Sequence, residues 1–354
     1  MTARVPRLAA AVLAAVLATG CSASPTLPAL ATAERAARTD DVDGSLAAYR
    51  EAQVTCQGER VVRKRRAACA DALLGEAEEL ERAGRPADAI VRYLAIPARA
   101  GTDRATAATA LYRAGDLMLR AEPAETRQTE AAVAALWRAV TAYPDEGSAA
   151  DALRRLLELE RGRDATTFAA ACEAQLGPLA RTGVADNVLW TLADLAEHEG
   201  ADARAARADY DRIAAEYPQS GLRDDARWHA ARISRALGDP AGAVTRLRAL
   251  LATREISIGT GSYFSIWLDD AQLELGRILR DDLHDLPGAA VAFRATVNDY
   301  SASILRDDAL FELAVTLEAM HDHAAACRID HLLATSFPDS KYLERDAHKA
   351  LACP

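Results

Sequence analysis

The sequence predicts an all-α fold built from stacked helical hairpins. Half of the 354 residues are hydrophobic, yet only 5% are aromatic, which suits many thin, alanine-lined helix contacts better than one large aromatic core. Over residues 307–338, apolar side chains recur at steps of three and four on both sides of a break at 321–323. This is the pattern of two amphipathic helices joined by a tight turn. Neither helix can bury its apolar stripe alone, so the pattern requires neighbouring copies of the hairpin.

The first twenty residues are predicted to be a targeting segment rather than part of the fold. Two arginines precede an uncharged apolar run over residues 8–18, which is too short to span a bilayer. Small residues then lead into Cys21. This order resembles the signal of bacterial lipoproteins, and the resemblance implies that Cys21 is acylated as the first residue of the mature chain. The alternative is an ordinary secretory signal cut near Ala23, with Cys21 discarded.

The domain organisation follows from this leader. Residues 21–30 contain two prolines among small residues and are predicted to be a short tether. Residues 31–354 are predicted to form one helical repeat domain. Serine rather than aspartate at position 22 is, by resemblance to lipoprotein sorting, typical of the outer membrane. We therefore expect a chain that is lipid-anchored in the cell outer membrane and faces the periplasm.

A recurring small residue marks the first helix of each hairpin. An alanine or valine followed by an apolar residue four positions later returns every 36 to 45 residues. We call these positions anchors; they are Ala72, Ala110, Ala152, Val188, Ala226, Ala271, Ala309 and Ala347. Five residues after each anchor the residue is alanine or glycine, with Leu157 as the exception. A second helix can cross the first closely there, so the spacing predicts about seven to eight hairpins.

The ends of the second helices carry the family resemblance. Aromatic and proline pairs such as Tyr217 and Pro218 close several of them, because proline supplies no backbone donor and clashes with the preceding turn. Ser220 and then the acidic pair before Ala226 follow. The chain therefore resembles the tetratricopeptide repeat (TPR) superfamily, and in particular bacterial envelope lipoproteins of the BamD and YbgF type. The resemblance covers about residues 40–354 and implies a TPR-like solenoid.

One insertion interrupts the repeat between the anchors Ala226 and Ala271. The surplus residues fall in 255–265, which include Tyr263 and Phe264. Insertions in repeat arrays go to loops, often on the binding side, which makes the two aromatic residues candidates for partner binding. In the alternative interpretation they belong to a long turn and tuck onto neighbouring helices.

Apart from the lipidated position, five cysteines remain. Cys56 and Cys69 bracket the turn between an early second helix and the next first helix, and antiparallel packing can bring Cys327 to Cys353. An exported compartment favours both disulfides. Cys172 is then left as a buried free thiol.

Zinc is the alternative to a disulfide at Cys327. His323, Cys327 and His331 are spaced four apart and share one face of a helix, and these ligand types bind zinc. We favour the disulfide over zinc at Cys327, because an exported compartment is oxidising. No metal is therefore predicted.

The sequence contains no recognised catalytic or cofactor-binding motif. It has no phosphate-binding loop, no dinucleotide fingerprint, no zinc-protease histidine pair and no nucleophile elbow. The net charge of −10 also lacks the basic footprint of a nucleic-acid binder. We therefore predict a protein that is not an enzyme, takes no cofactor and binds no nucleic acid.

Two functions from different classes fit these observations. The first is a non-enzymatic, lipid-anchored scaffold that binds a protein or peptide of the cell envelope, which the resemblance associates with outer-membrane assembly or envelope coordination. The second is a solute- or glycan-binding accessory lipoprotein of an uptake or cell-wall pathway.

A candidate binding stripe lies two positions after the anchors. Aromatic residues occupy four of six such positions, as Tyr112, Trp190, Trp228 and Phe311. The resemblance implies that first helices line the concave side of the array, and aromatic anchors with arginine are typical of protein-binding hot spots. In the competing interpretation these rings are braces that pack adjacent hairpins together.

Overall fold

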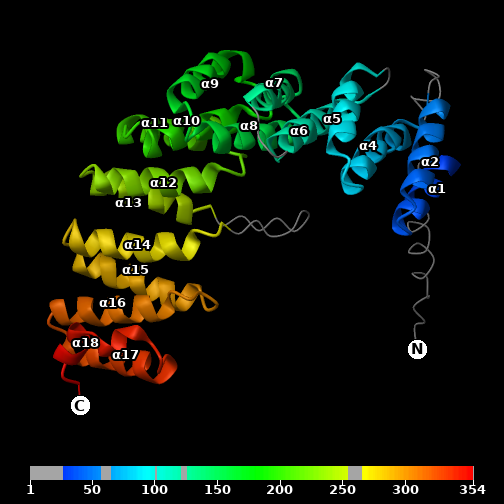
Figure 1. Cartoon of the computed structure of the whole chain (residues 1–354). Coiled ribbons are helices and arrows are strands. Elements are labelled where there is room, and N and C mark those ends of the chain that lie inside the picture. Colours follow the sequence, from blue (N-terminus) through cyan, green and yellow to red (C-terminus); the bar gives the residue numbers. More distant parts are fainter. Residues whose placement is uncertain (1–26, 57–64, 100–101, 121–125, 254–264, 354) are drawn as a thin grey trace, which may run out of the picture. The chain divides into compact units, whose positions relative to one another are not determined.

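The computed structural model describes residues 27–56, 65–99, 102–120, 126–253 and 265–353. Every regular element in these ranges is a helix, which confirms the all-α prediction (Figure 1). Backbone contacts divide the chain into two compact units, Met1–Arg155 and Leu156–Pro354. Each unit is a run of helical hairpins of TPR-like type.

Unit 1 contains three hairpins that pack in chain order. In each pair, α1 with α2, α4 with α5, and α6 with α7, consecutive helices lie against each other. Two buried clusters of apolar side chains join neighbouring hairpins through α2 and α4. The elements are α1 (Pro28–Arg38), α2 (Val42–Thr55), α4 (Arg66–Arg82), α5 (Pro86–Ala95), the 3₁₀ helix η1 (Ile96–Ala98), α6 (Arg104–Arg120), α7 (Thr126–Ala142) and α8 (Gly147–Glu160), whose last turn passes into unit 2.

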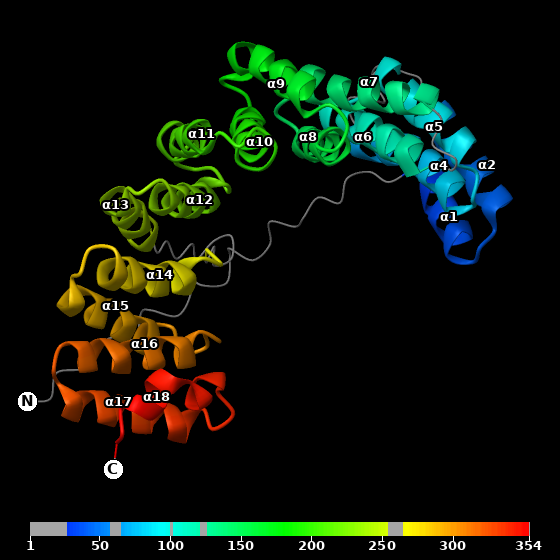
Figure 2. The same cartoon turned by 60° about the vertical axis from the view of Figure 1, so that its left-hand side comes forward.

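Unit 2 contains four hairpins, α10 with α11, α12 with α13, α14 with α15, and α16 with α17. They lie in successive layers, and α18 covers the last one (Figures 1 and 2). One buried apolar cluster runs from α12 to the C-terminal residues. The elements are α9 (Ala165–Leu179), α10 (Ala185–His198), α11 (Ala203–Glu216), α12 (Arg223–Ala236), α13 (Pro240–Leu251), α14 (Leu268–Asp281), α15 (Leu286–Asp299), α16 (Arg306–Ala319), α17 (His323–Ser336), the 3₁₀ helix η2 (Lys341–Glu344) and α18 (Asp346–Ala350).

The turn inside each unit 2 hairpin has the same construction. A residue with positive φ is followed by an aspartate whose side chain accepts a backbone N–H of the second helix. This cap satisfies a donor that has no partner within the helix. Gly238 adopts the left-handed conformation in one of these turns, with φ 77°. The capping aspartates are Asp202, Asp239, Asp285 and Asp322.

The small residues predicted at the helix crossings are required by the packing. A Cβ atom added to Gly276 of α14 would lie 2.5 Å from Cε1 of Phe293 on α15. Gly115 of α6 approaches Leu136 of α7 in the same way, at 2.7 Å from its Cγ. The first and second helices therefore meet closely where the sequence places alanine or glycine.

The structure departs from the sequence prediction at the N-terminal boundary. The first helix begins at Pro28, three residues before the predicted domain start, because Leu27 and Leu30 are buried in the first hydrophobic cluster. The leader, Cys21, Tyr263 and Phe264 lie outside the described residues. Among the residues that are described, none of the helices has the length and apolar character needed to cross a bilayer.

Candidate functional site

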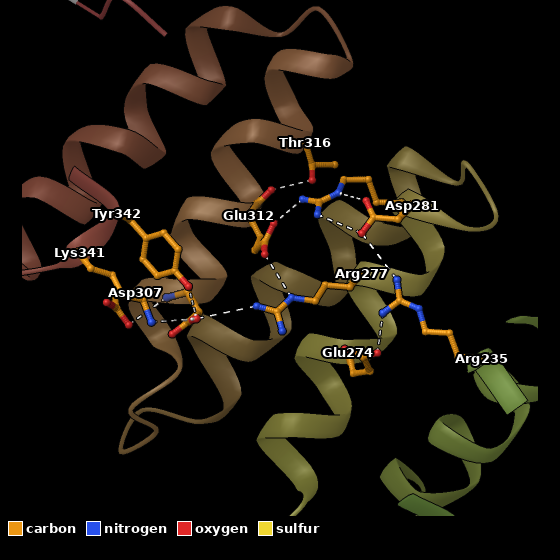
Figure 3. Close-up of polar contacts among 11 residues, drawn as sticks. Arg235, Glu274, Arg277, Asp281, Asp307, Glu312, Thr316, Lys341 and Tyr342 are labelled. Carbon is orange, nitrogen blue, oxygen red and sulfur yellow. Dashed lines mark hydrogen bonds and ion pairs between the residues drawn. The ribbon is translucent and has the colours of Figure 1, made fainter. Parts of the chain in front are cut away.

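Ion pairs connect each first helix of unit 2 to the next. The residue nine positions after one anchor meets the residue three positions after the following anchor. Thus Arg235 Nη1 of α12 lies 2.6 Å from Glu274 Oε1 of α14, and Arg280 Nη1 of α14 lies 2.5 Å from Glu312 Oε2 of α16. Figure 3 shows this row of contacts running from helix to helix. We call it the first-helix ladder, and it marks the face formed by α10, α12, α14 and α16.

The order of acidic and basic residues in the first-helix ladder changes along the chain. Between α10 and α12 the acid comes first, and Glu197 Oε2 lies 3.0 Å from His229 Nδ1. Unit 1 has the same order between α4 and α6, where Arg113 Nη2 lies 3.1 Å from Glu81 Oε2. Between α12, α14 and α16 the arginine comes first. The repeat therefore fixes where a charged pair stands but not which partner is acidic.

The second helix of each of three hairpins supplies an aromatic ring that contacts a charged ladder residue of the first helix. The type of ring depends on whether that residue is acidic or basic. Tyr210 of α11 donates its hydroxyl to Glu197 over 3.0 Å, as Tyr93 of α5 does to Glu81 over 3.2 Å. Where the first helix carries Arg280 instead, the ring is Phe293, and the guanidinium lies 5.5 Å from its centre. A phenol can donate to a carboxylate, whereas a phenyl face attracts a cation. Burial, and then the charge of Glu197, raise the pKa of the Tyr210 hydroxyl.

A second row of contacts joins the starts of the first helices. A serine just before one first helix donates to the first acid of the previous repeat. Ser303 Oγ lies 2.6 Å from Asp269 Oδ2, and Ser340 Oγ lies 2.7 Å from Asp307 Oδ2. Ser220 donates to Asp186 at 2.5 Å. The serine that supports the family resemblance is therefore one half of a clamp between repeats.

Two of the predicted stripe residues are braces between hairpins. Trp228 is 9% exposed and stacks on Trp267 with ring centres 5.2 Å apart. Phe311 is 6% exposed and stacks on Tyr342 at 4.6 Å. Trp267 Nε1 also donates to Asp225 over 2.7 Å. Most of each ring is already in contact with the next repeat, which leaves little area for a partner.

The other predicted stripe residues differ in setting. Trp190 is half-buried and packs edge-on against Tyr210 and His229, with ring centres 5.1 and 5.4 Å away. Tyr112 is half-buried in α6 of unit 1. Sequence reasoning placed the aromatic positions correctly on first helices but missed the ladder, because its signal is a pairing between positions in different repeats.

Arg232 is the cationic side chain that the ladder leaves exposed. It follows its anchor by six positions, as Asp194 and Arg277 do in other repeats. Those two make cross-repeat pairs with Arg161 and Glu312. Within the described part of the chain Arg232 has no ion-pair or hydrogen-bond partner, and it lies between the two ends of the ladder on α12.

The cysteines form the pairs that the sequence predicts. The Sγ atoms of Cys56 and Cys69 are 2.01 Å apart and connect the end of α2 to α4, and those of Cys327 and Cys353 are 2.10 Å apart. Cys172 is free and buried in α9, and burial raises the pKa of its thiol to about 12. Cys327 is therefore a disulfide partner in the structure and not a zinc ligand. The residues described here contain no group of three side chains suited to holding a metal.

Comparison with known proteins supports the repeat assignment. The tetratricopeptide repeat family pattern matches residues 187–220, which run from α10 through α11 to Ser220. No curated protein matches this chain in sequence. The match covers one hairpin, and the neighbouring hairpins repeat its turn, clamp and ladder. Together these findings support a TPR protein.

Solved structures of low sequence identity resemble the chain. A tetratricopeptide repeat protein from Parabacteroides merdae is 13% identical, with 82% of this chain and 97% of that chain covered and a TM-score of 0.33. The human IFIT1 dimer with PPP-AAAA is 14% identical, with coverage of 91% and 82% and a TM-score of 0.35. Naa15/Naa10 bound to HypK is 17% identical, with coverage of 92% and 45% and a TM-score of 0.39.

Proposed function

We propose that this TPR protein is a non-enzymatic scaffold of the cell envelope. In this proposal a lipid on Cys21 holds it in the outer membrane, facing the periplasm, and the first-helix face of unit 2 binds a protein or peptide. The observation that carries the proposal is the first-helix ladder, because it fixes four helices into one continuous polar face around the exposed Arg232.

The chemistry of the face suits a protein partner. Arg235 and Arg277 keep 29% and 32% of their side chains exposed although each is paired. Arginine presents several donors in a fixed geometry and is enriched in binding hot spots. Fixed pairs also hold the donors in place before binding, which reduces the entropy lost when a partner arrives.

The disulfides support an exported location. Stable disulfides form in oxidising compartments and are rare in the cytosol. The two pairs, one in each unit, are therefore consistent with a chain whose leader directs it out of the cytoplasm. Assembly of the outer membrane or coordination of the envelope is the role that the lipoprotein resemblance suggests for such a scaffold.

Site-specific photo-crosslinking tests the binding face. A crosslinking amino acid replaces Arg232 on α12, and in a matched control it replaces Arg248, which is exposed on the second helix α13. We expect a defined protein adduct in intact cells from position 232 and none from 248. Equal adducts at both positions, or none at 232, would contradict the proposed face; the absence of any protein adduct would favour a solute or glycan ligand instead.

Metabolic labelling tests the anchor. Labelled palmitate is expected in the wild-type chain and not in a Cys21→Ser variant. Equal labelling of both proteins would contradict the anchor while leaving the binding face untouched.

A further inference from the structure

A carboxylate, an imidazole and a disulfide sulfur contact one another in succession at the end of unit 2. Glu318 Oε2 of α16 is 2.8 Å from His323 Nδ1, and His323 Nε2 is 3.5 Å from Cys327 Sγ. His323 is the first residue of α17 and Cys327 lies one turn later, so both side chains share a face of the helix. The imidazole therefore contacts the carboxylate with one nitrogen and the sulfur with the other.

This group is open to solvent. His323 is 54% exposed and Glu318 is 45% exposed. Cys327 and its partner Cys353, the penultimate residue, are only partly buried. The Cys56–Cys69 disulfide differs in two respects, because Cys69 is 5% exposed and unit 1 contains no histidine in its sequence. A dissolved thiol can reach the C-terminal disulfide beside an imidazole.

We propose that Cys327–Cys353 is a thiol-exchange site, at which an external thiol forms a mixed disulfide with Cys353. The external thiolate attacks Cys353 Sγ, and a new S–S bond forms as the old one breaks. The electron pair of the broken bond goes to Cys327 Sγ, which leaves as a thiolate beside His323. The leaving sulfur is the one next to the imidazole because a neighbouring imidazolium stabilises a thiolate, and a more stable thiolate leaves faster.

Glu318 supports this step through His323. Its carboxylate accepts a hydrogen bond from His323 Nδ1 and so holds the ring with Nε2 facing Cys327 Sγ. A second external thiolate completes the reduction by attacking the mixed disulfide, which leaves two thiols on the chain and one disulfide between the two external molecules. The other titratable groups of α17, of α18 and of the turn before α17 are His321, Asp322, Arg328, Asp330, His331, Asp346, His348 and Lys349.

The end of the array can stay folded while this bond opens. Leu351 is 3% exposed and belongs to the main apolar cluster of unit 2. His348 Nδ1 of α18 also lies 2.5 Å from Asp330 Oδ1 of α17. These contacts hold α18 against the last hairpin independently of the disulfide, so exchange does not require the repeat to unfold.

Thiol exchange followed by disulfide mapping tests the proposal. The oxidised full chain is incubated with reduced glutathione, quenched with acid, alkylated and mapped by mass spectrometry. We expect glutathione on Cys353 and the alkyl group on Cys327. His323→Gln should slow the opening about threefold to tenfold, because the leaving sulfur loses the imidazole beside it, and Glu318→Gln should have a smaller effect. His331→Gln, one turn beyond Cys327 on α17, is the matched control and should open at the wild-type rate.

Three results would overturn the proposal. They are an unchanged rate in His323→Gln, glutathione found mainly on Cys327, or equal slowing by His331→Gln. A second measurement keeps the test valid if His323→Gln destabilises the oxidised chain. In a Cys353→Ser chain, iodoacetamide should alkylate Cys327 several-fold faster than in the Cys353→Ser chain that also carries His323→Gln. A partner protein's thiol and a small thiol are distinguished by repeating the assay with a reduced dithiol protein, and exchange with either thiol through Cys353 supports the site.

Discussion

Removing the indole of Trp228 is expected to destabilise unit 2. The side chain is 9% exposed and stacks on Trp267, with rings 5.2 Å apart and tilted by 14°. Truncating a buried tryptophan to alanine typically costs about 3 to 5 kcal/mol. Of this, about 0.5 to 1.5 kcal/mol comes from the aromatic pair itself. Trp228→Ala should therefore weaken the junction between α12 and α14.

Thermal unfolding followed by circular dichroism measures this loss. In a unit of this size each kcal/mol lowers the Tm by about 2 to 4 °C, so we expect a fall of about 6 to 20 °C. Arg232→Ala is the matched control, because it lies one turn further along the same helix and is exposed. Its effect on the free energy of unfolding should stay within about 0.5 kcal/mol.

The same variants separate a brace from a binding surface. If Trp228 is a brace, stability falls steeply in Trp228→Ala. If instead the crosslinked adduct from position 232 disappears while the Tm falls by less than about 2 °C, which corresponds to under about 1 kcal/mol, the indole serves the partner and the brace interpretation is refuted.

Three further perturbations probe the ladder and the crossings. Arg235→Glu should cost about 2 kcal/mol in urea unfolding because it faces Glu274 from within a partly buried row; adding Glu274→Arg should restore part of this, and no recovery would contradict direct pairing. Gly276→Ala should cost about 1 to 3 kcal/mol through overpacking, whereas a Cβ at Gly162 meets nothing within 4 Å and should be nearly neutral. Because the pKa of Tyr210 is raised above its unfolded value of about 10, stability present below pH 10 should fall as the pH rises further, by about 1.4 kcal/mol per pH unit. Other tyrosines, Tyr93 and Tyr342 among them, also have a raised pKa, so the slope in Tyr210→Phe should be shallower by the contribution of this one group, and identical slopes would argue against it.

The fold was predictable because its signal is local and repeated. The small residue five positions after each anchor, such as Gly276, is dictated by a close helix crossing. The proline after Tyr217 ends a helix for a backbone reason that needs no tertiary information. The predicted tether over residues 21–30 overlaps the first helix, because Leu27 and Leu30 are buried in a cluster with residues of α2 and α4.

The candidate site was less predictable because its contacts join different repeats. The acidic pair before Ala226 reads as a solvated helix start, yet Asp225 accepts the indole N–H of Trp267 from 42 residues away. Likewise, the aromatic positions were found from spacing, but spacing alone cannot say whether a ring faces solvent or the next hairpin. That choice depends on which residue the neighbouring repeat presents.

The change in the order of acid and base along the first-helix ladder occurs at α12. Toward α10 it offers His229 to Glu197, and toward α14 it offers Arg235 to Glu274, so both of its neighbours face it with acids. On α14, by contrast, an acid faces one neighbour and arginines face the other. Arg232 stands between the two basic positions of α12 and, among the described residues, pairs with neither acid row. A carboxylate or other electron-rich group brought by a partner would meet an arginine there without having to displace one from an existing pair.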